Sequence, residues 1–218
     1  LVPDIVQIGN EINSEILQPN GTTKNNIDWK RNAFLISKGI EAVKTFNKNK
    51  ERKVETMLHI AQPENAGPWF SDAELNGLTD FDWICLSYYP LWSKVSMEQL
   101  PSAISGLVKT FKKKLLIVET AYPHTFFNAD PANNILDQKA LITGISGTPD
   151  GQLQYLNKLV ELTMKGGGAG IIYWEPAWIS SKAKTPWGDG SHWDNATFFD
   201  ATKGNEALPA FSFFNSNK

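Results

Sequence analysis

The sequence predicts an α/β fold with a parallel sheet, and three observations support this. Short apolar, β-branched runs alternate along the 218 residues with longer segments in which apolar residues recur every three to four positions. No two strand-like runs are joined by a hairpin signal. Two of the runs, 5–8 and 115–118, lead into Glu11 and Glu119. A (β/α)8 (TIM) barrel places its reactive groups at such strand ends.

Five segments are expected to be buried parallel strands. Each is a short run rich in apolar residues and bounded by polar or turn-forming residues. They cover residues 4–10, 54–61, 81–89, 115–120 and 170–174. Pro90 directly follows the third of these runs, where a residue without an N–H ends the strand.

The helices expected after the first three strands have capping signals and an apolar stripe. Asp28 is placed to cap a helix over 29–47. Ser71 and Glu74 form a capping-box pattern that predicts a short helix. A third helix begins near Ser96, with four apolar residues expected on its inner face: Leu100, Ile104, Leu107 and Phe111.

Two further helices are expected after the last two strands. Thr148 and Pro149 read as an N-cap and a proline at the first helical position, which predicts a helix to Met164. A final helix is expected around 204–215. The intervening loops, 121–148 and 176–195, are long enough to suggest a functional role.

Composition argues against two classes of partner. The net charge is −2 and the sequence pI is about 6.0, with no basic stripe, so nucleic acid is not expected. No apolar run reaches the roughly 18 residues that a membrane span requires. The single cysteine, Cys85, rules out an internal disulfide and reads as a small buried hydrophobic residue.

A polar or aromatic group follows each of the five strands. In chain order these are Asn10 and Glu11, His59, Tyr88 and Tyr89, Glu119, and Trp174 and Glu175. Taken alone, Glu11 reads more readily as an exposed carboxylate that caps or forms a salt bridge in a loop, and Glu119 can also be an ordinary charged residue at the end of a strand. Together they are the minimum for glycoside hydrolysis, which uses two carboxyl groups.

The neighbouring residues have both a functional and a structural interpretation. His59 either donates to a substrate hydroxyl, orients a glutamate, or is a structural histidine bonded to the backbone. Tyr88 either hydrogen-bonds the nucleophile or is a core tyrosine. Trp174 is a candidate platform for a sugar ring. Five further tryptophans in or near loops either stack on sugars or cover the core: Trp69, Trp92, Trp178, Trp187 and Trp193.

Several stretches resemble family 53 glycoside hydrolases, the endo-β-1,4-galactanases. The Asn-Glu pair and the later glutamate are shared by a wide clan of retaining barrel enzymes. Two narrower motifs indicate the family: Tyr-Trp-Glu-Pro-Ala-Trp at 173–178 and Ser-His-Trp-Asp-Asn at 191–195. Three other segments also match it, at 4–12, 87–90 and 117–123.

The resemblance implies that residues 1–218 are the C-terminal portion of one (β/α)8 catalytic domain, from strand 4 onward. It implies that Glu11 is the acid/base, Glu119 the nucleophile, and Asn10 a ligand of the sugar 2-hydroxyl. His59, Tyr88, Trp174, Trp92 and Trp178 complete the expected substrate site. The implied substrate is β-1,4-galactan of pectic rhamnogalacturonan I or its galacto-oligosaccharides.

The resemblance also implies a structural calcium ion between the last two long loops. The matching positions are Asn128, Asp130, Asn134, Ser191 and Asp194. Oxygen ligands from two loops suit Ca²⁺. Ala132 and the asparagines depart from the family's usual histidine and aspartates, so an ordinary loop is the alternative.

By this alignment three β-α units lie outside the chain. We expect an N-terminal half of the same protein as a separate chain or associated fragment, and a secreted or cell-surface location because the substrate is polymeric. Two alternatives remain. One is a related retaining endo-glycanase acting on mannan, xylan or glucan, and the other is an inactive, sugar-binding half-barrel.

Overall fold

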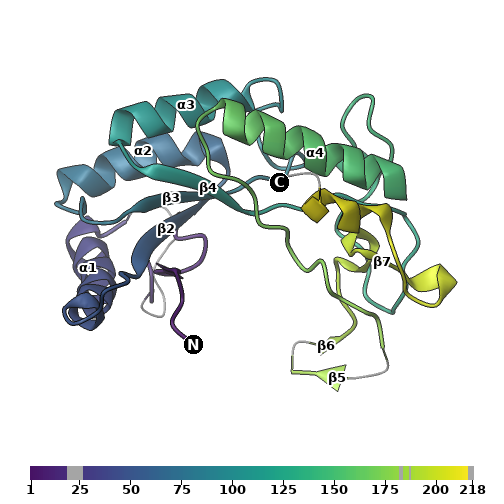
Figure 1. Ribbon diagram of the computed structural model, residues 1–218, viewed down its shortest axis with the longest axis horizontal. Helices are drawn as coiled ribbons and strands as arrows, with labels where there is room; N and C mark the ends of the chain where they lie inside the picture. Colours follow the sequence, from purple (N-terminus) through teal and green to yellow (C-terminus); the bar gives the residue numbers. More distant parts are fainter. Residues whose placement is uncertain (19–26, 182–183, 187, 216–218) are drawn as a thin grey trace.

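The main sheet of the computed structural model is parallel, as predicted. The structure describes residues 1–18, 27–181, 184–186 and 188–215. The four strands are β1 (Ile5–Gln7), β2 (Glu55–Ala61), β3 (Trp83–Ser87) and β4 (Lys114–Glu119), and they lie in the order β1-β2-β3-β4 (Figure 1). Each neighbouring pair is parallel.

Four α-helices form an arc along one side of this sheet (Figure 1). They are α1 (Trp29–Asn47), α2 (Pro63–Leu75), α3 (Leu100–Phe111) and α4 (Pro149–Lys165). A single large apolar cluster fills the layer between helices and sheet. This curved sheet with outer helices is the arrangement of consecutive units of a (β/α)8 barrel and confirms the predicted fold class.

The capping signals of two helices act as expected. The Asp28 side chain accepts a hydrogen bond from the N–H of Arg31, and the Thr148 side chain accepts one from Gly151. Both bonds satisfy N–H groups that lack a partner inside the helix. The four apolar residues predicted on the inner face of α3 are all buried.

The prediction for α2 was wrong about where the helix begins. It starts at Pro63, and Ser71 lies inside it, donating to the carbonyl of Gly67 rather than capping. Pro68 lies inside the helix, where the missing N–H donor and the crowding of its ring against the carbonyl four residues earlier cost stability. Burial of Trp69 and Phe70 against the core offsets that loss.

Residues 170–174 run beside β4, but they form only a parallel bridge between Ile117 and Ile171. Three backbone hydrogen bonds hold the segment there, including one of 2.9 Å from the Trp174 N–H to the Thr120 carbonyl. Gly170, at φ 151°, interrupts the extended backbone needed for a longer ladder. The segment therefore occupies the predicted place without being a regular strand.

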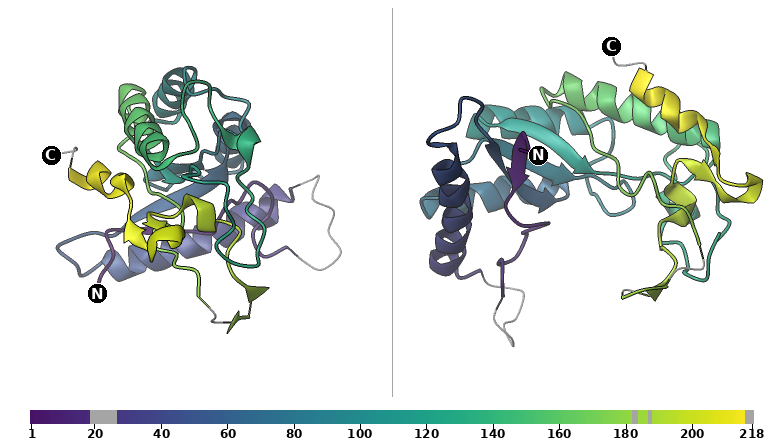
Figure 2. Two further views of the ribbon diagram at one scale, coloured as in Figure 1. Left: turned by 90° about the vertical axis from the view of Figure 1, so that its right-hand side faces the viewer. Right: turned by 60° about the horizontal axis from the view of Figure 1, so that its bottom comes forward.

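The end of the chain also differs from the predicted helix over 204–215. A 3₁₀-helix, η4 (Pro209–Asn215), packs along α4 (Figure 2), whereas residues just before it form a small antiparallel pair, β7 (Phe199–Asp200) with β8 (Glu206–Ala207). Pro209 fits the first turn of a helix, where no N–H is needed, so the helix begins there.

In the described parts of the long loops and of the segment after them, the remaining elements are short. These are η1 (Gln138–Ala140), β5 (Lys184–Thr185) paired antiparallel with β6 (Gly188–Asp189), η2 (Asp194–Ala196) and η3 (Ala201–Lys203). Within the described residues, no helix is both long and apolar enough to cross a bilayer.

Candidate active site

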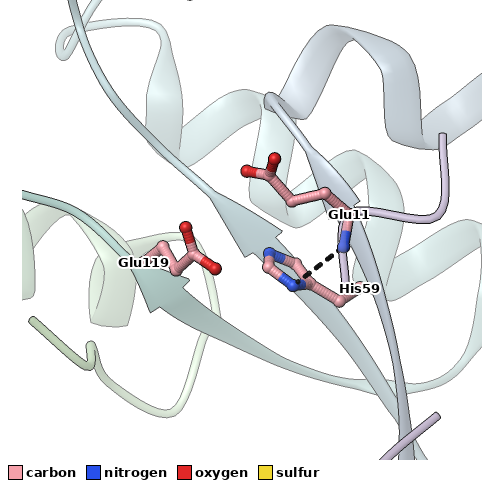
Figure 3. A group of neighbouring side chains, drawn as sticks. All are labelled: Glu11, His59 and Glu119. Carbon is pink, nitrogen blue, oxygen red and sulfur yellow. Dashed lines mark hydrogen bonds between the residues drawn. The ribbon is translucent and has the colours of Figure 1, made fainter. Parts of the chain in front are cut away.

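Two glutamates meet at the carboxyl end of the sheet. Glu119 is the last residue of β4, and Glu11 lies four residues beyond the end of β1. Their side chains point toward each other with His59 between them (Figure 3). One ligand atom from each of the three residues lies within 4.8 Å of the others. This spacing agrees with the roughly 5–5.5 Å of retaining glycosidases and is shorter than the roughly 6.5–9.5 Å of inverting ones.

A tight turn after β1 aims Glu11 into the site. Gly9 has φ 81°, and a Cβ there would lie 2.5 Å from Cγ2 of Ile12, so only glycine fits. Glu11 itself has φ 45°. Its N–H donates to Nδ1 of His59 at 3.3 Å, and the N–H of Ile12 donates to the His59 carbonyl at 2.9 Å. β2 therefore fixes the backbone that carries Glu11.

Glu119 is the more buried of the two carboxyl groups, with 8% of its surface exposed. Tyr89 donates its hydroxyl to Oε2 at 3.3 Å, and the side chain of Asn10 also hydrogen-bonds to Glu119. Burial, and secondly the charge of Glu11, raise the pKa of Glu119 to about 7. Glu119 therefore binds a proton below about pH 7, and the donors Tyr89 and Asn10 favour its ionised form.

A buried serine and histidine stand behind Glu11. Ser87 donates to Oε1 of Glu11 at 2.6 Å, and Nε2 of His59 lies 2.8 Å from the same hydroxyl. Nδ1 of His59 lies 3.1 Å from Oδ1 of Asn10, which also accepts a hydrogen bond from Gln7. Burial lowers the pKa of His59 to about 4, so its ring is uncharged at neutral pH.

An aromatic wall completes a cleft of about 390 Å³ around the two glutamates. Its lining includes Tyr89, Trp92, Trp174 and Trp193, beside Asn10, Ala61 and Gln62. The ring of Trp193 lies 5.3 Å from that of Tyr89 and 6.1 Å from that of Trp92. Trp92 is 46% exposed, so part of its surface is accessible to a ligand.

The structure brings together most, but not all, of the residues expected at this site. Tyr88 is fully buried and donates to the carbonyl of Val95 at 3.1 Å, so the expectation that it contacts the nucleophile was wrong. Side chains alternate across a strand. Because Ser87 faces the glutamates, Tyr88 faces the helices and Tyr89 faces the site.

Trp178 also lies away from the glutamates. Its indole N–H donates to Ser180 at 3.2 Å, and Ser180 in turn donates to Asp130. Trp178 belongs to the loop cluster described below and does not line the cleft. Trp187 lies outside the described residues.

Sequence reasoning missed Ser87, Gln62 and the placement of Trp193. Ser87 belongs to the segment 87–90 that resembles the family, but a serine at a strand end has little chemical signature of its own. The signal that was available is its alternation with Tyr88, since one of the two must share a face with His59.

The residues expected to hold calcium form one cluster between the two long loops. Asp194 Oδ2 accepts from the N–H groups of Ala129 and Asp130, and Asp130 Oδ2 accepts from the N–H of Ser191. The Asn134 side chain donates to Oδ1 of Asn128 at 2.7 Å. The loops thus carry these side chains to a common place.

The donor set fits a hard cation. Asp194 Oδ1 is buried with no hydrogen-bond partner in the part of the chain that the structure describes. Burial, as the largest effect, raises the pKa of Asp194. Among the described residues, the one cluster of three His, Cys, Asp or Glu ligands is Glu11, His59 and Glu119. A calcium site in the loops would therefore rest on two aspartates with amide, hydroxyl and carbonyl oxygens.

Comparison with known proteins gives a consistent result. The model of glycosyl hydrolase family 53 matches residues 1–214. An arabinogalactan endo-β-1,4-galactanase of Cellvibrio japonicus is 51% identical over 218 residues, which are 100% of this chain and 58% of that protein. The chain thus spans less than two thirds of the length of this relative.

Two solved structures share the fold. The family 53 catalytic domain of Ignisphaera aggregans superposes with a TM-score of 0.82 at 30% identity, over 97% of this chain and 58% of that one. A fungal β-1,4-galactanase superposes with a TM-score of 0.75 at 27% identity, over 98% and 62%.

Proposed function

Since this chain belongs to glycosyl hydrolase family 53, we propose that the protein cleaves β-1,4-linked galactan internally, with retention of anomeric configuration. The observation that carries the proposal is the separation of at most 4.8 Å between one oxygen of Glu11 and one of Glu119. A gap of this size leaves no room for a water molecule beside the sugar, as an inverting reaction needs. The named relatives support galactan over mannan, xylan or glucan.

In the proposed reaction Glu119 attacks the anomeric carbon while Glu11 protonates the departing glycosidic oxygen. The product of this step is a galactosyl ester of Glu119. Glu11, now ionised, takes a proton from water, and the resulting hydroxide displaces Glu119 and releases the sugar. Tyr89 holds Glu119 by the hydrogen bond to Oε2, which stabilises the carboxylate before attack and after release.

The aromatic wall supports the choice of a sugar substrate. Trp174 and Trp193 lie with their rings 6.5 Å apart in a T-shaped arrangement, and Trp92 stands next to Trp193. Apolar ring faces stack on the C–H faces of sugars, whereas Asn10 and Gln62 offer hydrogen bonds to hydroxyl groups. We assign Asn10 to the 2-hydroxyl of the sugar that is cleaved.

The experiment is digestion of galactan, mannan, xylan and β-glucan by the full-length protein, with the product anomer followed by NMR. Galacto-oligosaccharides that first appear as the β-anomer are expected from galactan alone. If the α-anomer appears first, the retaining reaction is ruled out. If mannan, xylan or β-glucan is cleaved as fast as galactan, the proposed specificity for galactan is wrong.

The nucleophile is tested separately with Glu119→Ala. This variant should lose more than about 10³-fold of kcat, and azide should restore part of the rate by forming an α-galactosyl azide. Glu74→Ala is the matched control, because Glu74 is an exposed glutamate of α2 that does not line the cleft. Substantial activity of Glu119→Ala without azide would remove Glu119 from this role.

We also propose that the loop cluster binds a structural Ca²⁺. The residues that would hold it are Asn128, Asp130, Asn134, Ser191 and Asp194, and the unpartnered oxygen of Asp194 supports this. The ion would tie the two loops together near the wall that carries Trp193. It has no part in the chemical steps.

Two proposals concern the setting of this chain. The outer edge of β1 pairs with no other strand among the described residues, and an apolar hollow beside it is lined by Pro3, Val6, Ala42, Val43, Phe46 and Val54. We propose that a further part of the same protein covers this edge and completes the barrel.

We also propose that the protein degrades pectic galactan outside the cell or at its surface, where such polymers occur.

A further inference from the structure

We infer that Ser87 and His59 form a closed ring of hydrogen bonds with Glu11 that leaves Oε2 as the oxygen through which Glu11 exchanges its proton with substrate. The inference rests on the proposed function, in which Glu11 is the acid/base. Ser87 and His59 are fully buried in this ring and act on Glu11, so they are positioning residues.

The direction of the ring follows from one hydrogen that cannot move. The backbone N–H of Glu11 donates to Nδ1 of His59 at 3.3 Å, so Nδ1 must present a lone pair. A neutral imidazole then carries its proton on Nε2, which donates to the Ser87 oxygen 2.8 Å away. Ser87 is left to donate its own proton to Oε1 of Glu11 at 2.6 Å. The ring thus begins and ends on Glu11.

The other histidine tautomer serves the reaction poorly. A proton on Nδ1 would be donated to Oδ1 of Asn10, 3.1 Å away, and would turn the Ser87 hydroxyl toward Nε2. The 2.6 Å contact between Ser87 and Glu11 would then lack a hydrogen whenever Glu11 is ionised, which is the state that follows each protonation of a leaving group. Asn10 does not need this bond, because its Oδ1 already accepts from Gln7 at 3.0 Å.

The ring has a consequence for catalysis. Because Oε1 accepts from Ser87 in both protonation states of Glu11, the acid proton sits on Oε2. In the first step that proton goes to the glycosidic oxygen, and in the second Oε2 takes one from water. The same hydrogen bond stabilises the carboxylate formed in the first step, so it should assist most when the leaving oxygen is a strong base.

The test compares wild type and Ser87→Ala in the full-length protein on aryl β-galactobiosides with leaving phenols of graded acidity. In the variant kcat/KM should fall roughly ten- to a hundredfold for phenyl and little for 2,4-dinitrophenyl, because a charged group loses one hydrogen bond. Ser87→Thr should restore most of the loss, since it keeps the hydroxyl. Ser71→Ala, in the exposed part of α2, is the matched control. An equal loss for every leaving group would overturn the inference.

A second measurement does not depend on activity. Nitrogen-15 NMR of the full-length protein, with the His59 signals assigned from a His59→Gln variant, should show a proton on Nε2 and none on Nδ1. The opposite tautomer would overturn the ring even in an active enzyme. A wild type that cleaves no galactobioside but has the Nε2–H tautomer would instead refute the proposed function and leave the hydrogen-bonded ring in place.

Discussion

At the scale of single residues, Tyr88 and Tyr89 are neighbours whose hydroxyls lie on opposite faces of the strand end. Tyr89 donates to Glu119, whereas Tyr88 donates to Val95 under the helices. Both rings are buried, so burial alone does not distinguish the functional tyrosine from the structural one. The hydrogen-bond partner of each hydroxyl distinguishes the two tyrosines.

Replacing each tyrosine with phenylalanine should separate these roles. Tyr89→Phe removes a donor to a carboxylate and should lower kcat roughly tenfold or more, with little change in the free energy of unfolding. Tyr88→Phe should leave kcat near wild type and lower the free energy of unfolding by about 1 kcal/mol. Initial rates on galactan and urea unfolding measure the two quantities. Equal losses of activity in both variants would contradict the assignment.

The raised pKa of Glu119 predicts a pH dependence of activity. The nucleophile must be ionised, and burial beside Glu11 raises the pKa of Glu119 to about 7. The value of kcat/KM should therefore fall tenfold per pH unit on the acid side of about pH 7. The pH profile of Tyr89→Phe should turn at a higher pH than that of wild type, because the donor that favours the ionised form is absent. An unchanged acid limb would contradict this.

The same pKa predicts how stability varies with pH. The pKa of Glu119 rises from its ordinary value of 4.5 to about 7 on folding, so between these values the folded state binds more proton than the unfolded one and stability is lost as pH rises. Glu119→Gln should thus match wild type at pH 4 and exceed it by up to ~3 kcal/mol at pH 8. Thermal unfolding at the two pH values measures this, and a stabilisation that is the same at both would contradict it.

At the scale of elements, the site depends on two local irregularities. The turn through Gly9 carries Glu11 back over β2. Between β3 and β4 the register shifts by one residue, so that Ser87 pairs with Glu119 although Leu86 pairs with Ile117. An extra residue of this kind re-aims the side chains that follow it. The shift places Glu119 opposite Ser87, and Ser87 in turn donates a hydrogen bond to Glu11.

Gly9→Ala should disrupt this turn. The added Cβ would lie 2.5 Å from Cγ2 of Ile12, at a φ that alanine rarely adopts. We expect a loss of about 1–3 kcal/mol in stability and a larger fractional loss of kcat than of substrate binding, since Glu11 would move. Gly77→Ala is the control, because it shares a positive φ but has open space around it. Equal effects of the two changes would show that backbone strain, and not the position of Glu11, is responsible.

At the scale of the whole molecule, the open sheet edge and the long loops lie on opposite sides of the catalytic pair. β1 is only half-buried along its length, whereas β2 and β3 contain fully buried residues. The loops after β4 pack on each other through Asp130, Ser191 and Asp194. The first feature supports the proposal of a covering segment, and the second the proposal of an ion.

Chelation should therefore loosen the loops without altering the glutamates. Treating the full-length protein with EGTA is expected to lower its Tm by several degrees, and Ca²⁺ but not Mg²⁺ should restore it, because Mg²⁺ demands a tighter octahedral site. Asp194→Asn should make the Tm insensitive to EGTA. If the Tm of the wild-type protein changes neither when EGTA is added nor when Ca²⁺ is then restored, the ion is excluded.

By itself the sequence determined the alternation of strands and helices, the caps at Asp28 and Thr148, and the two glutamates at strand ends. These features depend on the local spacing of apolar residues and on residue type, both of which can be read directly from the sequence. It did not determine that Tyr89 rather than Tyr88 reaches Glu119, that Ser87 stands behind Glu11, or that Trp193 joins the wall. Those depend on strand register, on a one-residue shift between β3 and β4, and on how distant loops pack. Such long-range geometry arises only when the segments meet, because one residue of register reverses the face on which a side chain lies.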